Sequence, residues 1–186
     1  LYDKGVSFRS ASDSEIIAAL LSTHEADSID EALAETMPRL QGAFSTVVMT
    51  TDKLVAFRDG AGLRPLSLGR IGERWCVASE SCAFDIIGAE LVREVEPGEM
   101  VVISEAGMES RQVIDSPRKA FCVFEHIYFA RPDSILEGNR TQVSRRKMGE
   151  ILWREAPVDA DVVIAVPDSG TPAATGYSKA SGLPGD

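Results

Sequence analysis

The chain has 186 residues, of which 44% are hydrophobic and 26% charged, with a formal net charge of −10 at pH 7, as is ordinary for one large or two small globular domains. The acidic balance argues against a nucleic acid or an anionic membrane as partner, although a small phosphorylated ligand needs only a few backbone N–H groups. No apolar run approaches the ~20 residues of a membrane-spanning helix and no segment resembles a signal peptide, so we expect a cytoplasmic protein.

Two helices are predicted before residue 43. Residues 12–15 have the S-x-x-E spacing of a capping box and precede apolar side chains at helical spacing. Residues 28–31 repeat this signal, and Pro38 and Gly42 are expected to close the second helix.

Short runs of β-forming residues follow, separated by turn residues. Their close spacing leaves room for hairpins but not for crossover helices, so the sheet is predicted to be antiparallel. The runs are 43–50, 53–59, 65–70 and 74–80, followed by a short helix near 82–87 and strands near 90–95 and 99–104.

The polar stretch 107–119 has no clear period and is our candidate domain boundary. Beyond it we predict a strand over 122–130, a helix over 141–155, a strand over 161–167 and a helix over 171–181. The apolar run 161–167 is typical of a parallel strand covered on both faces. An antiparallel first part and an α/β second part predict two domains, 1–108 and 109–186.

A candidate phosphate site follows the apolar run, at the strand end where ligands of open α/β sheets bind. It consists of Asp168, Ser169, Gly170 and Thr171. Gly170 allows close approach of a ligand, N–H groups of the helix start would face an anion, and Asp168 and Ser169 add oxygens suited to Mg²⁺ or a ribose. A plain helix cap by Ser169 or Thr171 explains the local pattern equally well.

Two further features carry chemistry. Asp13 lies at a helix start, where the local pattern favours capping or dipole complementation over the alternative, a carboxylate that receives the α-ammonium of an amino-acid ligand. Residues 128–134 could form an ion-paired corner, yet the order Tyr-Phe-Ala-Arg-Pro-Asp-Ser is too particular to arise from propensity.

Together these clusters resemble the glutamine phosphoribosylpyrophosphate amidotransferases (amidophosphoribosyltransferases), the family of the first committed step of de novo purine synthesis. The resemblance rests on FEHIYFARPDS at 124–134, TQVSRRKMGEILWRE at 141–155 and ADVVIAVPDSGTPAATGY at 160–177. Upstream, SDSEII, GAFSTVVM, GLRPLSLGR, VASESCAFD and VEPGEMVVI agree in order along essentially the whole chain.

The resemblance implies a two-domain α+β / α/β fold: the C-terminal part of an N-terminal-nucleophile αββα glutaminase domain, followed by the start of a type I phosphoribosyltransferase α/β domain. It implies an enzyme that releases ammonia from glutamine and uses it to displace pyrophosphate from phosphoribosylpyrophosphate, giving 5-phosphoribosylamine. It also implies a homo-oligomer inhibited by purine nucleotides.

The family nucleophile is a processed N-terminal cysteine, and none of Cys76, Cys82 and Cys122 matches it. No catalytic residue is therefore assigned. The chain opens on Leu1 without a methionine and stops shortly after a predicted helix, which we interpret as an internal piece of a longer protein that is inactive by itself.

The family's site residues transfer position by position. Asp13 matches the aspartate that holds the amino group of the substrate glutamine. Residues 168–171 match the loop that holds the pyrophosphate of the sugar donor, with Ser169 at a position assigned to Mg²⁺.

Cys122 matches a ligand of the [4Fe–4S] cluster found in one branch of the family. By itself, a cysteine at a strand start is most often a small buried hydrophobe. The odd cysteine count without a CxxC pair argues against a disulfide framework, and three cysteines cannot complete a four-cysteine site within this chain. Cys76 and Cys82 are interpreted as structural.

Two other functions are weighed against this one. A glutaminase domain from another amidotransferase would explain neither the Tyr-Phe-Ala-Arg-Pro-Asp-Ser segment nor the PDSGT loop. A catalytically incomplete homologue that acts only as a binding or assembly module stays open, because both reaction centres are incomplete in these residues.

Overall fold

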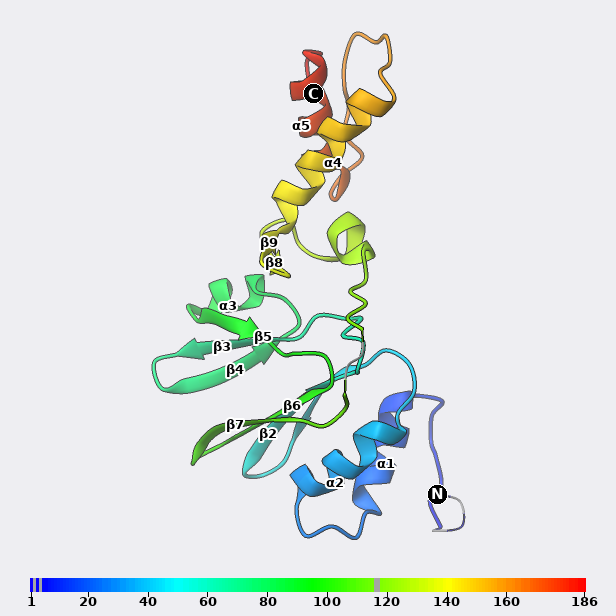
Figure 1. Ribbon diagram of the computed structural model, residues 1–186, viewed down its shortest axis with the longest axis vertical. Helices are drawn as coiled ribbons and strands as arrows, with labels where there is room; N and C mark the ends of the chain where they lie inside the picture. Colours follow the sequence, from blue (N-terminus) through cyan, green and yellow to red (C-terminus); the bar gives the residue numbers. More distant parts are fainter. Residues whose placement is uncertain (2, 4, 116–117) are drawn as a thin grey trace. The chain divides into compact units, whose positions relative to one another are not determined.

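The computed structural model describes residues 1, 3, 5–115 and 118–186, and these residues form two compact units (Figure 1). Unit 1 comprises Leu1–Leu63 and Val95–Ala120, and unit 2 comprises Arg64–Glu94 and Phe121–Asp186. None of the helices in the described ranges is long and apolar enough to cross a membrane. Residues 64–94 lie in unit 2 although the sequence places them in the first domain; the domain boundary near residue 108 stays a prediction, and residues 116–117 beside it lie outside the described residues.

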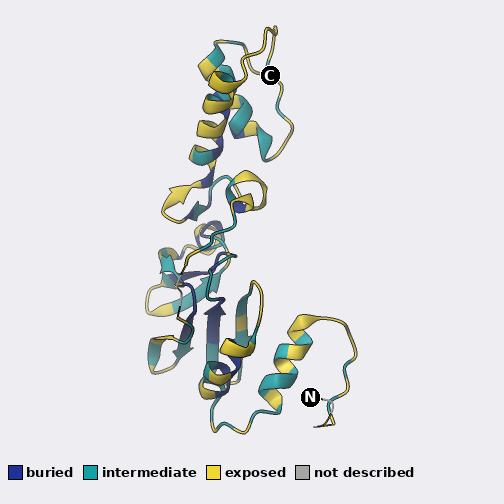
Figure 2. Cartoon of the chain, turned by 45° about the vertical axis from the view of Figure 1, so that its right-hand side comes forward, coloured by how far each residue is buried: buried dark blue, intermediate teal, exposed yellow. Residues whose placement is uncertain are grey.

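Unit 1 combines two helices with a four-stranded sheet. Its antiparallel pairing agrees with the prediction, but the runs predicted to share one sheet divide between this sheet and a second one in unit 2, and β7 was not predicted. The core is formed by Leu33, Met37, Val55, Phe57 and Met100, and buried segments of the sheet are dark blue in Figure 2. The elements are α1 (Asp13–Ser22), α2 (Ile29–Thr36), the 3-10 turn η2 (Met37–Arg39), β1 (Ser45–Met49), β2 (Lys53–Arg58), β6 (Glu99–Ser104) and β7 (Gly107–Gln112), with strand order β1-β2-β6-β7.

The two predicted helix starts differ in detail. Ser28 Oγ accepts a hydrogen bond from the Glu31 N–H at 3.3 Å, so the cap of α2 is confirmed. The Ser12 side chain caps nothing in α1, and the capping box predicted there is wrong. Glu15 instead accepts hydrogen bonds from Ser10 Oγ at 2.6 Å and from the Arg9 N–H at 2.9 Å. The Ser12 N–H, which a capping box would direct to Glu15, donates to Ser10 Oγ at 3.2 Å. The hydrogen bond from Ser10 is the largest cause of the lowered pKa of Glu15.

An ion pair between Lys53 on β2 and Asp30 in the first turn of α2 ties helix to sheet. The hydrogen bond from Lys53 lowers the pKa of Asp30 below its ordinary 3.8. A carboxyl whose pKa is depressed by folding adds stability that is complete above the unfolded value and is lost as the pH falls through the folded one. Lys53→Met is therefore expected to lower the free energy of unfolding modestly at neutral pH, since the pair is partly exposed.

Urea unfolding of the wild type and of Lys53→Met, measured from about pH 7 down to about pH 3, checks this expectation. The difference between the two curves should shrink at the acid end. A difference of the same size at every pH would show that the lysine stabilises by packing and not by charge.

Unit 2 holds a second antiparallel sheet and a pair of helices. A Cβ at Gly69 would lie 2.7 Å from the Phe84 ring, so α3 packs directly on bare backbone of β3. The elements are β3 (Ser67–Ile71), β4 (Arg74–Ala78) and β5 (Glu90–Glu94) in the order β4-β3-β5, α3 (Cys82–Ile87), the hairpin β8 (Ile135–Leu136) and β9 (Asn139–Arg140), α4 (Thr141–Glu155) and α5 (Gly170–Ser181).

The strand predicted over 122–130 is wrong. Residues Glu125–Phe129 form a single wide helical turn, η3, of the π type. The buried Arg145 on α4 holds it, because its Nε donates to His126 O at 2.7 Å and its Nη2 to Ala130 O at 2.7 Å. Burial also lowers the pKa of this guanidinium. A distant side chain thus satisfies the backbone groups that a strand would have given to a neighbouring strand.

The predicted strand 161–167 is also wrong as a buried element. Its one parallel bridge among the described residues joins Val163 to Gly185. Ile164 is 70% exposed and Val166 is 80% exposed. A parallel strand needs hydrogen-bonded neighbouring strands along its length. Within the described ranges, residues 161–167 pair in this way only at Val163, opposite Gly185.

The stretch 107–119, which the sequence marks as a candidate domain boundary, contributes β7 to the first sheet. Residues Gly107–Gln112 pair with β6 along its whole length, from Ser104 opposite Gly107 to Glu99 opposite Gln112. Four of the six β7 residues are exposed, which explains why no apolar alternation marks this strand in the sequence.

Candidate functional site

Asp13 is the first residue of α1 and is exposed to solvent. Its carboxylate forms no hydrogen bond or ion pair with any residue that the structure describes. No hydrogen bond therefore supports a capping role for Asp13. The position places a negative charge at the positive end of the helix dipole. The geometry leaves this carboxylate accessible to a cationic ligand group, and its role stays a prediction.

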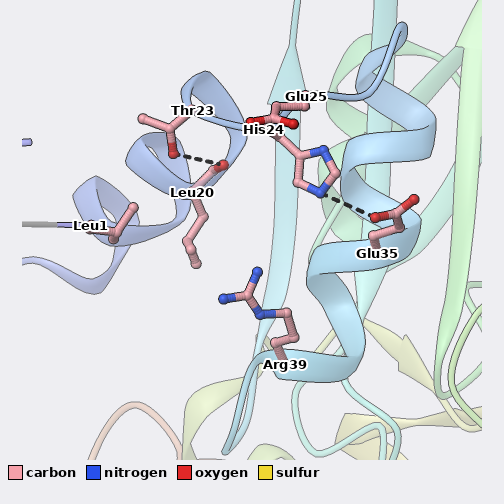
Figure 3. A pocket seen from close by; sticks show the side chains of 7 residues that line it. All are labelled: Leu1, Leu20, Thr23, His24, Glu25, Glu35 and Arg39. Carbon is pink, nitrogen blue, oxygen red and sulfur yellow. Dashed lines mark hydrogen bonds and ion pairs between the residues drawn. The ribbon is translucent and has the colours of Figure 1, made fainter. Parts of the chain in front are cut away.

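A cavity of about 360 Å³ lies at the opposite end of α1 (Figure 3). His24 Nε2 lies 3.5 Å from Glu35 Oε2 and joins the end of α1 to α2. With ~1.5 Å of rise per residue, α1 separates this cavity from Asp13 by about 14 Å, so it is no part of the Asp13 site. Its lining mixes both charge signs and consists of Leu1, Leu20, Thr23, His24, Glu25, Glu35 and Arg39.

The loop 168–171 runs directly into α5. Ser169 already has helical backbone angles, φ −66° and ψ −30°, and its side chain caps no amide, so a cap by the Ser169 hydroxyl is not formed. The Gly170 N–H donates to Val166 O at 3.1 Å, and the Thr171 N–H lies 3.4 Å from Asp168 O. These two amides donate within the loop and not to an outside anion, contrary to the expectation from the sequence. The accessible polar side chains of the loop are those of Asp168 and Thr171, which are exposed, and of Ser169, which is half-buried.

Packing does not explain the glycine at position 170. A Cβ there would meet only Val166 Cβ, at an ordinary 3.8 Å. The absence of a side chain therefore leaves space beside the loop that the described residues do not require. Such space suits the close approach of a ligand, and binding at Gly170 stays a prediction.

The donor set of this loop fits Mg²⁺ in one respect. Asp168 and Ser169 supply adjacent oxygens, the ligand type that Mg²⁺ prefers. Within the part of the chain that the structure describes, no group of three or more His, Cys, Asp or Glu side chains is arranged to hold a metal ion. The loop therefore fits a Mg²⁺ ion that takes most of its ligands from phosphates and water and only one or two from protein.

Cys122 is half-buried and free, and it precedes η3, where its carbonyl accepts a hydrogen bond from the Glu125 N–H at 3.0 Å. Cys82 is buried on α3, and burial raises the pKa of the Cys76 thiol on β4. Among the described residues these thiols do not gather into one site. The roles of Cys122 as a cluster ligand and of Cys76 and Cys82 as structural residues stay predictions.

The segment 131–135 forms the ion-paired corner that the sequence left open. Arg131 grips Asp133 with two parallel bonds, Nε to Oδ1 at 3.0 Å and Nη2 to Oδ2 at 2.9 Å. Sequence reasoning missed the groups that hold this turn, Glu80 and Ser81, which accept hydrogen bonds from it. The partners of these hydrogen bonds lie more than 50 residues apart, so no local pattern predicts them. The sequence signal that could have indicated them is the occurrence of both VASESCAFD and FARPDS in one chain.

Known proteins resemble this chain over almost its whole length. Residues 1–85 match the family described as "Glutamine amidotransferase domain". The amidophosphoribosyltransferase of Mycobacterium tuberculosis is 47% identical over 173 residues, which is 92% of this chain and 33% of that protein. That of Bacillus subtilis is 40% identical over 184 residues, which is 99% of this chain and 39% of the relative.

A solved structure agrees along the entire chain. The glutamine phosphoribosylpyrophosphate amidotransferase of B. subtilis, in complex with ADP and GMP, matches with a TM-score of 0.96 at 39% identity, covering 100% of this chain and 41% of its own. The mixed fold class predicted from the sequence is confirmed by this match. The chain spans about a third to two fifths of the length of the curated relatives it matches.

Proposed function

Because this chain belongs to the amidophosphoribosyltransferase family, we propose that the protein converts phosphoribosylpyrophosphate, glutamine and water to 5-phosphoribosylamine, glutamate and pyrophosphate, the first step of purine biosynthesis. The observation that carries the proposal is the extent of the similarity, which covers 92% to 99% of the chain. A glutaminase domain of another class would account for residues 1–85 and not for the loop 168–171.

The proposed roles follow from the chemistry of the exposed groups. The Asp13 carboxylate receives the α-ammonium group of glutamine. The loop 168–171 holds the pyrophosphate group of the sugar donor, with the Ser169 hydroxyl beside a magnesium ion. When bound, Mg²⁺ neutralises the charge that builds on the leaving pyrophosphate, which is the largest electrostatic demand of this displacement.

The partners proposed for the whole protein extend beyond these substrates. Purine nucleotides are proposed as feedback inhibitors, supported by the description of the B. subtilis structure as a complex with ADP and GMP. A cytoplasmic homo-oligomer that binds neither nucleic acid nor membrane is proposed from the sequence.

Glutamine-dependent release of pyrophosphate by the full-length protein tests the proposal. We expect release that requires glutamine or free ammonia together with phosphoribosylpyrophosphate and Mg²⁺. No release with every substrate saturating would refute the enzyme and favour the alternative, a catalytically incomplete homologue that serves only as a binding module.

Iron content tests the proposed role of Cys122. We expect the full-length protein, purified without oxygen, to absorb visible light and to contain about four iron atoms per chain. Cys122→Ser should lose the absorbance and most of the iron, whereas Cys76→Ser, which removes another half-buried thiol of the same unit, should keep both. A colourless, iron-free and active wild type would contradict a cluster.

A further inference from the structure

The turn 131–135 is hydrogen-bonded on one side to the segment between β4 and α3. The Arg131 N–H donates to Glu80 Oε2 at 2.8 Å, and the Ser134 hydroxyl donates to the same oxygen at 2.7 Å. The Ile135 N–H donates to Ser81 Oγ at 2.7 Å. Ser134 is fully buried and Ser81 is 4% exposed, so these bonds have little competition from water.

The other side of the turn caps α4. The Thr141 N–H donates to Ser134 O at 2.9 Å, and the Gln142 N–H donates to Pro132 O at 2.8 Å. These are the first amides of the helix, which have no partner within it. The turn thus donates hydrogen bonds to residues 80–81 and accepts hydrogen bonds from the first amides of α4. The position of the start of α4 therefore depends on Glu80 and Ser81.

From α4 the dependence continues to α5, because the two helices touch backbone to backbone. A Cβ at Gly149 would lie 1.9 Å from Ala173 O, and one at Gly176 would lie 1.9 Å from Arg146 O. The edge-to-face contact of Trp153 with Tyr177, at 5.4 Å between ring centroids, adds a second point of attachment. The loop 168–171 leads directly into α5 and therefore follows any displacement of α4 (Figure 1).

We propose that Glu80 and Ser81 are positioning residues for the phosphoribosylpyrophosphate loop 168–171, acting through the turn 131–135, α4 and α5. Both residues lie within the stretch 1–85 that matches a glutamine amidotransferase domain, so position in the sequence would assign them to glutamine chemistry. The hydrogen bonds assign them to the sugar-phosphate half of the reaction. This inference rests on the proposed function for its kinetic test and on the contacts alone for its structural test.

Glu80 is expected to have the larger effect because one of its oxygens accepts two hydrogen bonds from the turn, one of them from the fully buried Ser134, besides a long contact of 3.9 Å from Cys82 Sγ. Removing the carboxylate leaves a buried hydroxyl and a backbone N–H without their acceptor, and the turn must shift to find others. A displacement of about 1 Å transmitted to a substrate-holding loop is enough for an effect of about 10²-fold on a reaction.

The experiment compares Glu80→Ala, Glu80→Gln and Glu73→Ala in the full-length protein. With ammonia as nitrogen donor, Glu80→Ala should raise the KM for phosphoribosylpyrophosphate about tenfold or more. The KM for glutamine, measured with the sugar donor saturating, should stay as in the wild type. Glu80→Gln keeps a carbonyl acceptor of the same length and should restore most of the affinity. Glu73→Ala is the matched control, since the Glu73 side chain is 95% exposed and pairs with Arg70 on its own hairpin.

Hydrogen exchange supplies the readout that needs no activity. In Glu80→Ala the amides of Thr141, Gln142 and the loop 168–171 should exchange faster than in Glu73→Ala. A raised KM for glutamine with an unchanged KM for the sugar donor would overturn the inference and return Glu80 to the glutaminase. Unchanged exchange at α4 would overturn it as well. A wild type that makes no phosphoribosylamine would remove the proposed function, yet the exchange result would still decide whether Glu80 positions the loop.

Discussion

Asp13→Ala is expected to abolish the use of glutamine by the full-length enzyme while sparing synthesis from free ammonia. The side chain forms no hydrogen bond or ion pair with a described residue, so its removal breaks no such bond within the protein. Loss of a charge-assisted hydrogen bond to an ammonium group corresponds to about 10²-fold in kcat/KM for glutamine. The measurement is the rate of pyrophosphate release with each nitrogen donor in turn.

Two controls separate ligand binding from structure. Asp13→Asn keeps the shape and removes the charge, so it should be nearly as defective with glutamine as Asp13→Ala. Glu15→Ala removes the carboxylate that fastens the loop at Ser10, so it should affect folding and both nitrogen donors alike. The free energy of unfolding of Asp13→Ala should lie within about 0.5 kcal/mol of the wild type. Equal loss of both activities in Asp13→Ala would mean that Asp13 is structural.

Elements whose signals are local were predictable from the sequence. The helix α2 begins at a serine cap and presents Leu33 to the core, and Met37 follows directly in η2, so all these features lie within ten residues. The hairpin of β1 and β2 follows from two β-forming runs a turn apart, with Val48 opposite Val55. These patterns are all local, because propensity and hydrophobic periodicity depend on residues that are close together in the sequence.

The failures arise where distant groups decide the backbone. The run 122–130 is apolar and aromatic enough for a strand, yet Arg145 binds its carbonyls and bends it into η3. Glu125, fully buried in that turn, pairs with Arg64 at 3.0 Å, and burial raises the pKa of its carboxyl. Arg145 lies 15 to 20 residues from the groups that it binds, and Arg64 lies some 60 residues from Glu125. The sequence of the segment 122–130 contains no periodic pattern that would indicate these partners.

The candidate site divides in the same way. The chemistry proposed for Asp13 and for the loop 168–171 could be suggested from the sequence because these residues stand in a recognisable order. The support of the loop by Glu80, Ser81 and the turn 131–135 was not, because hydrogen bonds across more than 50 residues have no spacing rule. A sequence motif therefore indicates which groups touch a ligand better than it indicates which groups hold them.

Gly149→Ala and Gly176→Ala are each expected to lower the stability of the α4–α5 pair by about 1–3 kcal/mol. On an isolated helix the same change is favourable, by about 1 kcal/mol, because alanine is the better helix former. The sign reverses here because each new methyl group would overlap a carbonyl oxygen of the facing helix at 1.9 Å, and backbone cannot give way as a side chain can. Both glycines are buried in this contact.

Gly170→Ala is the matched control, since it makes the same substitution at the start of α5 where the nearest atom would be 3.8 Å away. Hydrogen exchange of α4 and α5 measures the effect directly and separates local opening of the pair from unfolding of the whole unit. Faster exchange in both helices for Gly149→Ala and Gly176→Ala, with wild-type exchange for Gly170→Ala, is the expected result. Slower exchange in either of the two buried variants would mean that the helices stand apart in solution.

Because the loop 168–171 leads into α5, the two buried variants should also weaken phosphoribosylpyrophosphate binding with the carboxylate of Glu80 intact. That outcome would show that the helix contact itself carries the positioning.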